Sequence, residues 1–394
     1  MEIRKGYKQS EVGIIPEDWD ISTIGQQFEI QLGKMLDAEK NTGIHKPYLG
    51  NKSVQWSKID VTDLPTMAMS VTDLVRYRLR RGDLLVCEGG EVGRSAIWDE
   101  PIQECYYQKA LHRLRPLSGF NTYLIIAFLY HWTSNGLLAN YVSQSSIAHL
   151  TSEKLAIIPL PVPKQHEQHA IGAALSDVDA LLNSLDALIA KKRLIKQGAM
   201  QELLTGKRRL PEFNKTWDKK SLENICNIEK GEQLNRDTLS LSDDYPAWNG
   251  GIEPSGFTNK WNTEENTITV SEGGNSCGFV NFVKQKFWRG GHCYALKNID
   301  RGVSKEYLYQ FLKHNEAVIM ALRVGSGLPN IQRARLSSFV VFLPSLPEQT
   351  AIAEILSDMD AEISALEQKR EKTRQLKQGM MQELLTGRIR LVQP

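Results

Sequence analysis

The 394-residue sequence lacks the features of a membrane protein and the motifs of several enzyme classes. No apolar stretch approaches the roughly 18 residues that span a bilayer, and the N-terminus has no apolar run of the kind found in signal peptides. There is no Gly-x-x-x-x-Gly-Lys-Ser/Thr loop, no Asn/Asp-Pro-Pro-aromatic motif of amino-methyltransferases, no Gly-x-Ser-x-Gly and no His-Glu-x-x-His. We therefore expect a cytoplasmic protein with no membrane span, no catalytic centre and no bound cofactor of its own.

Cysteine is scarce and the net charge is small. The five scattered cysteines include no Cys-x-x-Cys pair, which predicts neither a metal site nor a disulfide framework. The formal net charge is only +2, whereas domains that bind nucleic acid are often strongly basic. If this chain binds DNA, its cations must gather on one face, or partner subunits must supply many of the phosphate contacts.

What the sequence does contain is an internal repeat. The segment QELLTGKRRL at residues 201–210 recurs as QELLTGRIRL at residues 382–391, identical at eight of ten positions. The same offset of 181 relates further pairs upstream: Pro163 to Pro344, Glu167 to Glu348, Gln168 to Gln349 and Leu175 to Leu356. One offset shared over this length indicates a duplicated unit.

The rest of each unit has diverged. Glu88–Gly90 matches Glu272–Gly274, and Ala110–Leu111 matches Ala295–Leu296, at offsets of 184 and 185. We interpret each unit as a diverged domain followed by a closely repeated helical arm. The predicted boundaries are 1–160 for the first domain, 161–209 for the first arm, 210–343 for the second domain and 344–394 for the second arm.

The arms have the pattern of coiled-coil helices. Residues 166–205 contain no proline, and apolar residues recur from Ile171 to Ile189 at alternating spacings of four and three. The second arm repeats the pattern but has Arg370 where Ile189 stands. About 38 helical residues make a rod of roughly 57 Å, enough to hold two domains about one DNA turn apart; a simple dimerisation hairpin is the alternative. The predicted fold is α+β, with two tandem mixed α/β domains separated by two long antiparallel coiled-coil helices in a pseudo-twofold arrangement.

The diverged domains combine strand-like runs that lead into the Glu-Gly-Gly turns with predicted helices over residues 121–133 and 304–322. Aromatic residues lie among basic and amide side chains, the types that contact base edges. The candidates for DNA contact are Lys52, Arg94, Lys109, His112, Arg113, Gln144 and Ser146 in the first domain and Asn249, Lys286, Arg289, His292, Ser326, Asn330, Gln332 and Arg333 in the second. Each feature also has a structural interpretation: Glu-Gly-Gly as a tight turn, the histidines as structural residues and the tryptophans as core.

Together these features resemble a known family, the specificity subunits of type I restriction–modification enzymes. The resemblance extends over essentially the whole chain and is most specific in residues 15–19, 82–90, 108–115 and 279–296. The paired Pro-x-x-x-Glu-Gln and Gln-Glu-Leu-Leu-Thr-Gly elements are similar to that family's arms, although the residues between Pro163 and Glu167 differ from those between Pro344 and Glu348.

The resemblance implies that each diverged domain reads one half of a split double-stranded DNA target. It also implies that the arms pair, set the spacer and dock two methyltransferase subunits, with Leu203, Leu204, Leu384 and Leu385 as candidate contacts. S-adenosylmethionine for adenine N6 methylation would then be bound by those subunits, and ATP and Mg²⁺ would be used by partner subunits, including restriction subunits with translocase activity.

Other classes of function are the alternatives. The missing motifs disfavour a stand-alone nuclease or methyltransferase. The near-neutral charge is compatible with a scaffold that does not read DNA. An antirestriction mimic of the specificity subunit is the remaining alternative, but a DNA mimic should be acidic, and this chain is not.

Overall fold

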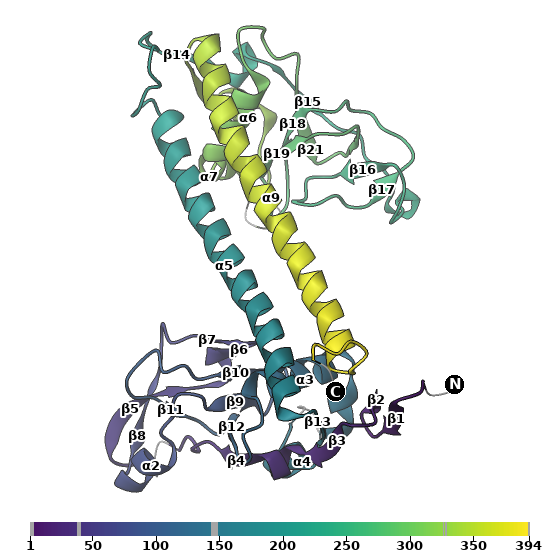
Figure 1. The fold of residues 1–394 in the computed structure, drawn as a ribbon. Coiled ribbons are helices and arrows are strands. Elements are labelled where there is room, and N and C mark those ends of the chain that lie inside the picture. Colours follow the sequence, from purple (N-terminus) through teal and green to yellow (C-terminus); the bar gives the residue numbers. More distant parts are fainter. Residues whose placement is uncertain (1–3, 38–40, 143–148, 326, 328, 393–394) are drawn as a thin grey trace. The chain divides into compact units, whose positions relative to one another are not determined.

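The computed structural model describes residues 4–37, 41–142, 149–325, 327 and 329–392. The chain divides into two compact units, the first formed by residues 1–186 and 368–394 and the second by residues 187–367. Each unit contains part of the long helices α5 (Gln165–Leu203) and α9 (Leu346–Leu384), which we call the arms, and a mixed α/β domain, which we call the head (Figure 1). The predicted α+β fold with two tandem mixed domains and two long helices is confirmed.

The first head is built on a four-stranded antiparallel sheet in the order β10-β9-β12-β4, beside a three-stranded sheet in the order β11-β5-β8. Two-stranded pairs are β1-β2, β3-β13 and β6-β7. The strands are β1 (Tyr7–Ser10), β2 (Gly13–Pro16), β3 (Asp20–Thr23), β4 (Phe28–Leu32), β5 (Ile44–Leu49), β6 (Val54–Gln55), β7 (Lys58–Ile59), β8 (Thr66–Met69), β9 (Leu84–Cys87), β10 (Ser95–Ile97), β11 (Tyr106–Tyr107), β12 (Leu111–Pro116) and β13 (Pro159–Val162). The helices are α1 (Ile24–Gln27), α2 (Val71–Arg76), α3 (Thr122–Ser134) and α4 (Ser152–Ala156), with short 3-10 turns η1 (Asn51–Ser53) and η2 (Leu137–Tyr141).

The second head repeats this plan. Its four-stranded antiparallel sheet has the order β15-β21-β18-β19, its three-stranded sheet has the order β17-β16-β20, and β14 pairs with β22 as β3 pairs with β13. The strands are β14 (Asp218–Ser221), β15 (Asn227–Lys230), β16 (Tyr245–Trp248), β17 (Phe257–Thr258), β18 (Thr267–Ser271), β19 (Val280–Val283), β20 (Trp288–Arg289), β21 (Cys293–Lys297) and β22 (Val340–Leu343). The helices are α6 (Lys305–His314), α7 (Glu316–Met320) and α8 (Arg333–Ser337), with 3-10 turns η3 (Leu222–Asn224) and η4 (Arg236–Thr238).

One helix of each head packs between the sheet and the arms. The Asn121 side chain caps α3 by accepting a hydrogen bond from the Leu124 N–H at 3.1 Å, and the Ser304 side chain caps α6 in the same way. A single apolar cluster in each unit joins the sheet, this helix and buried faces of both arms. The prediction of one helix over residues 304–322 is wrong, because Asn315 ends α6 and the chain restarts as α7.

The arms run antiparallel to each other within each unit. In the first unit Asp179 lies 2.6 Å from Lys377, and Asp186 lies 3.0 Å from Arg370, so residue numbers rise along α5 as they fall along α9. Apolar side chains in the first two-thirds of each arm are buried, including Ile171, Leu175, Leu185, Ile189, Ile352, Leu356 and Ile363; Ile171 and Leu175 pack in the cluster of the first head, and Ile352 and Leu356 pack in that of the second. No helix within the described ranges is both long and apolar enough to cross a membrane.

The Pro-x-x-x-Glu-Gln element fixes the start of each arm to its head. Glu167 is fully buried and accepts hydrogen bonds from Trp19 Nε1 at 2.9 Å and from Arg390, which also pairs with Asp18 at 2.9 Å. The hydrogen bond from Arg390 holds the pKa of Asp18 below its usual range. Gln168 donates to the Pro163 carbonyl at 2.8 Å, which ties the helix start to the strand before it.

The second unit has the same junction with two differences, one of which is that Arg209 donates to the Lys215 carbonyl at 3.0 Å where Arg390 pairs with Asp18. Glu348 is buried and receives two hydrogen bonds from Arg209, at 2.6 and 2.7 Å, and Arg209 lies over the Trp217 ring. Trp217 Nε1 donates to no described residue, whereas Trp19 Nε1 donates to Glu167. Arg209 is therefore the side chain that donates hydrogen bonds to Glu348, whereas Glu167 receives them from both Arg390 and Trp19.

Candidate nucleic-acid interface

A clamped loop follows the central buried strand of the second head. β18 ends at Ser271, and Glu272 begins the Glu-Gly-Gly loop. The Glu272 N–H donates to the His292 carbonyl at 2.9 Å, and the Glu272 carbonyl accepts from the Ile331 N–H at 2.8 Å. Gly274 has a φ of 79°, a left-handed conformation that favours glycine. The loop is therefore held by the residue before β21 on one side and by the segment before α8 on the other.

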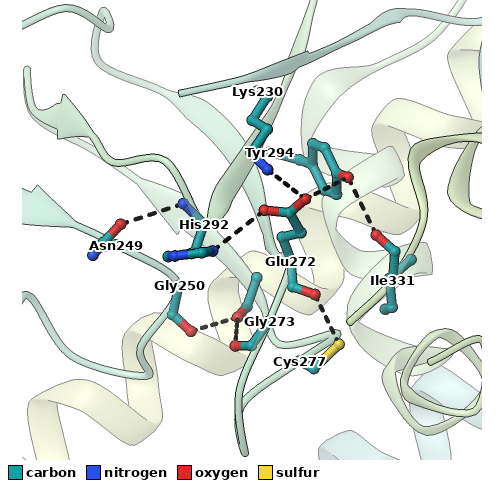
Figure 2. A network of polar contacts seen from close by, with 10 residues as sticks. Lys230, Asn249, Gly250, Glu272, Gly273, Cys277, His292, Tyr294 and Ile331 are labelled. Carbon is teal, nitrogen blue, oxygen red and sulfur yellow. Dashed lines mark hydrogen bonds and ion pairs between the residues drawn. The ribbon is translucent and has the colours of Figure 1, made fainter. Parts of the chain in front are cut away.

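The carboxylate of Glu272 is the centre of a polar network, which Figure 2 shows. Lys230 donates to one of its oxygens at 2.7 Å, and the Tyr294 hydroxyl lies 3.1 Å from the same oxygen. Burial and the Glu272 charge raise the pKa of Tyr294 to about 12, so its hydroxyl keeps its proton. The second oxygen of Glu272 receives no hydrogen bond and lies 3.5 Å from His292 Nδ1.

This network forms one wall of an open hollow. Asn249, His292 and Asn330, all predicted as DNA contacts, lie in its lining together with Lys230 and Glu272. The Asn249 side-chain oxygen accepts a hydrogen bond from the His292 backbone N–H at 3.3 Å, which holds the two residues beside each other (Figure 2). The hollow therefore gathers amide, imidazole and ammonium groups around a buried carboxylate.

The first head has the same loop with different side chains. The Glu88 N–H donates to the Ala110 carbonyl at 2.9 Å, and the Leu150 N–H donates to the Glu88 carbonyl at 2.8 Å. Ala110 thus occupies the place of His292, and the sequence match of Ala110–Leu111 to Ala295–Leu296 is wrong by three residues.

His112 takes the place of Tyr294 and does not reach the surface. It is fully buried, and its Nε2 lies 2.8 Å from the Leu150 carbonyl, just as the Tyr294 hydroxyl lies near the carbonyl of Ile331. Burial lowers the pKa of His112, so the ring is neutral at neutral pH and Nε2–H donates to this carbonyl. The structure therefore gives His112 a supporting role under the loop rather than a surface for DNA.

Three other predicted residues of the first head, Arg94, Lys52 and Lys109, lie at or next to residues that contact its loop. Arg94 donates to the Asn51 carbonyl at 2.8 Å, and the Asn51 side chain donates to the Gly89 carbonyl at 3.0 Å. Lys52 and Lys109 are exposed, and Lys109 directly precedes Ala110. Asn51 had not been predicted.

Arg113, Arg289 and Lys286 lie elsewhere. Arg113 is 2% exposed and donates to Glu29 at 2.6 Å, while Arg289 is 8% exposed and lies 3.5 Å from Glu229. Their guanidinium groups are committed to these intramolecular contacts. Lys286 lies 4.0 Å from the centre of the Trp261 ring and outside the hollow.

The remaining predicted residues divide into three sets. Gln332 and Arg333 are exposed at the start of α8, directly after Ile331. Gln144, Ser146 and Ser326 lie outside the described residues. The predicted partner contacts are corrected, because they are buried in the clusters that join the arms to the heads: Leu203, Leu204, Leu384 and Leu385.

The sequence contained part of the signal for this site. The Glu-Gly-Gly match marked the loop, but nothing in the local pattern linked it to Lys230, which lies 42 residues earlier on β15. Within the described residues there is no group of three or more His, Cys, Asp or Glu side chains placed to hold a metal ion.

Comparison with known proteins identifies relatives of the whole chain. The MjaX type I restriction enzyme specificity subunit of Methanocaldococcus jannaschii is 25% identical over 417 aligned residues, which cover 98% of this chain and 97% of that protein. The type I specificity subunit S.MpnORF638P of Mycoplasma pneumoniae is 33% identical over 175 residues, 44% of this chain and 46% of that protein. The solved S subunit of a type I restriction-modification system from M. genitalium has the same fold, with a TM-score of 0.70 at 17% identity over 98% of both chains.

The family model described as the type I restriction modification DNA specificity domain matches the chain twice, over residues 16–193 and 214–377. The two matches cover most of the chain, and each spans one head and much of the arm that follows it. They confirm the prediction of a DNA specificity subunit that leaves catalysis to other subunits. The chain belongs to the family of type I restriction modification DNA specificity subunits.

Proposed function

We propose that the first head reads one half of a split DNA target and the second head reads the other half, with the arms setting the unread spacer. The observation that carries this proposal is the contrast between heads and arms. The heads repeat one topology but present different side chains at equivalent loops, while the arm ends are nearly identical in sequence. Divergence at the loops suits two different base sequences.

In the second head, the hollow beside Glu272 supplies the reading groups. Side-chain amides such as those of Asn249 and Asn330 match the donor and acceptor of an adenine edge, and Lys230 and His292 add donors for guanine or phosphate. In the first head, Asn51 contacts the corresponding loop at Gly89 and Arg94 contacts Asn51, and the exposed Lys52 and Lys109 are the chain neighbours of Asn51 and Ala110.

The arms would hold two methyltransferase subunits, which bind S-adenosylmethionine and methylate adenine N6, and restriction subunits that use ATP and Mg²⁺ would join them. The duplication supports two copies of the methyltransferase subunit, because the repeated arm sequences would offer the same residues to each copy. A solved chain with a TM-score of 0.53 belongs to a type I system described with its complex assembly. The cytoplasm is the proposed location, since the chromosome lies there.

The test is an exchange of residues 20–155 for the corresponding domain of another specificity subunit. Adenine methylation is then mapped across the genome of cells that express the hybrid with its methyltransferase subunit. One half of the target should change while the other half and the spacer stay the same. A change in both halves would contradict the division between heads. The purified chain alone, given S-adenosylmethionine, should methylate no DNA.

A further inference from the structure

The buried carboxylate of Glu272 has one oxygen that its network leaves without a donor (Figure 2). Lys230 donates to Oε1 at 2.7 Å, and the Tyr294 hydroxyl lies 3.1 Å from the same atom. Oε2 receives no hydrogen bond from the described residues, although Glu272 is only 9% exposed. An unpaired buried acceptor costs free energy. His292 Nδ1 lies 3.5 Å from Oε2, so the imidazole is the group placed to complete this carboxylate.

The backbone of His292 is held in place while its side chain faces the hollow. Its N–H donates to the Asn249 side chain at 3.3 Å, and its carbonyl accepts from the Glu272 N–H at 2.9 Å. A Cβ at Gly250 would lie 2.5 Å from the His292 carbonyl oxygen, so the neighbouring segment packs closely against it. The His292 side chain is 60% exposed and lines the hollow. With Nδ1 directed at the carboxylate, Nε2 is the nitrogen available to a ligand.

The contact with Glu272 determines which nitrogen of the neutral ring carries the proton. A carboxylate only accepts hydrogen bonds, so a neutral imidazole beside it keeps its proton on the nitrogen that faces it. Nδ1 of His292 is then the donor, and Nε2 carries a lone pair. Nε2 donates only when the ring gains a second proton. Lys230 therefore supplies a donor to the hollow, and the neutral ring of His292 supplies an acceptor.

The first head shows that the fold does not depend on this pair. Ala110 takes the place of His292 there, and Leu32 takes the place of Lys230. The loop is nevertheless clamped by the same two backbone hydrogen bonds, to Ala110 and from Leu150. A polar pair found in one of two heads that share a sheet suits recognition rather than stability.

We propose that Nε2 of His292 accepts a hydrogen bond from the exocyclic amino group of one base in the second half of the target. Glu272 is the positioning residue that keeps Nε2 an acceptor. In the major groove adenine and cytosine present an amino group, whereas guanine and thymine present acceptors at the corresponding edge. The pair therefore selects an amino-bearing base at one position. This inference rests on the proposed function, in which the second head reads DNA.

Removal of one amino group at a time from the DNA tests the contact with the wild-type chain. Methylation mapping first gives the target. In synthetic duplexes, one adenine of the second half becomes purine or one cytosine becomes 2-pyrimidinone, on either strand, with the methylated adenine left intact. Binding by the full chain with its methyltransferase subunit is titrated at pH 8, where an imidazole is ordinarily neutral.

One of these deletions should weaken binding by the wild-type chain about fivefold more than it weakens binding by His292→Ala. The comparison subtracts the loss of base pairing, which both proteins meet equally. Equal weakening of the two proteins at every position would overturn the contact. His45→Ala, at an exposed histidine of the first head, is the matched control and should respond to each deletion as the wild-type chain does.

Glu272→Gln tests the positioning role. The ammonium of Lys230 donates and cannot accept, so the amide oxygen should face Lys230 and the amide N–H₂ should face His292. Nδ1 then accepts, the proton moves to Nε2, and Nε2 becomes a donor. In mapped methylation, the base at that position should change from adenine or cytosine to guanine or thymine, while the first half stays the same. Weaker methylation with an unchanged preference would overturn the positioning role.

The amino-group deletions decide the contact even where Glu272→Gln does not fold, because they use the wild-type chain and a variant of an exposed side chain. The proposed function is tested separately by exchanging the second head for that of another specificity subunit. If that exchange leaves the second half of the target unchanged, the proposed function fails. If the exchange changes the second half but no deletion is coupled to His292, this inference fails alone.

Discussion

The two heads share a backbone plan and differ in the side chains placed on it. Opposite Tyr294 in the second head stands Lys230, whereas opposite His112 in the first stands Leu32. The second head therefore has a charged network beneath its loop, and the first has an apolar neighbour and a neutral imidazole. Substitutions on adjacent strands change the chemistry at the loop without changing the sheet, which is how one fold serves two different surfaces.

The arm junctions extend the comparison. Both place an arginine on a buried glutamate, but only the first adds an indole donor to that glutamate. A matched pair of substitutions at these arginines tests whether the indole donor compensates for the loss of the ion pair.

The largest effect is expected from Arg209→Met. The change leaves the buried Glu348 without its donor and should destabilise the second unit by about 3 kcal/mol. Arg390→Met in an Asp18→Asn background, which removes the second ion pair of Arg390 beforehand, should cost its own unit less, because Trp19 still donates to Glu167. Peptide-resolved hydrogen–deuterium exchange measures each unit separately, and an equal or larger loss from Arg390→Met would show that the indole donor does not compensate.

A smaller effect is expected when Asn249→Ala and Asn330→Ala are combined. If both amides contact bases, DNA carrying the intact target should bind about thirtyfold more weakly or worse, from a loss of about 2 kcal/mol or more. Reading of the half assigned to the first head should not change. Asn259→Ala, at an exposed asparagine of the same head, is the control. Affinity equal to that of the control would remove these amides from the site.

The smallest expected effect is a loss of stability of the first unit at acidic pH. Burial lowers the folded pKa of His112, so the unfolded chain binds a proton first as pH falls below about 6.5. The contribution of neutral His112 is thus present above that pH and is lost as pH falls toward the folded pKa. Burial also lowers the pKa of His131 in the first unit and of His314 in the second. We therefore assign to His112 only the loss of stability by which the first unit exceeds the second.

The measurement is hydrogen exchange at pH 7 and pH 5.5, compared between the two units. The first unit should lose protection by up to about 1.4 kcal/mol per pH unit more than the second. His112→Gln, which keeps a neutral donor, should remove this excess, and Tyr294→Phe should leave the pH response of the second unit unchanged. An excess that persists in His112→Gln would assign it to another group.

Local patterns predicted the elements better than they predicted the contacts. The four–three spacing from Ile171 to Ile189 predicted a helix, and the proline-free range 166–205 lies within two residues of the observed ends of α5, Gln165 and Leu203. Among the candidates for DNA contact, Asn249, His292 and Asn330 meet at one hollow, but Arg113 and His112 are buried. A basic or imidazole side chain has the same sequence signature whether it faces solvent or an internal partner.

The sequence by itself determined the duplication, the long helices and the family, because these depend on order and spacing along the chain. Only the tertiary structure decided what surrounds each Glu-Gly-Gly loop. Lys230 reaches Glu272 because β15 and β18 both pair with β21, a register that no local pattern specifies. The same physical reason separates the heads: the position is set by the shared sheet, and the chemistry is set by which residue each strand brings to it.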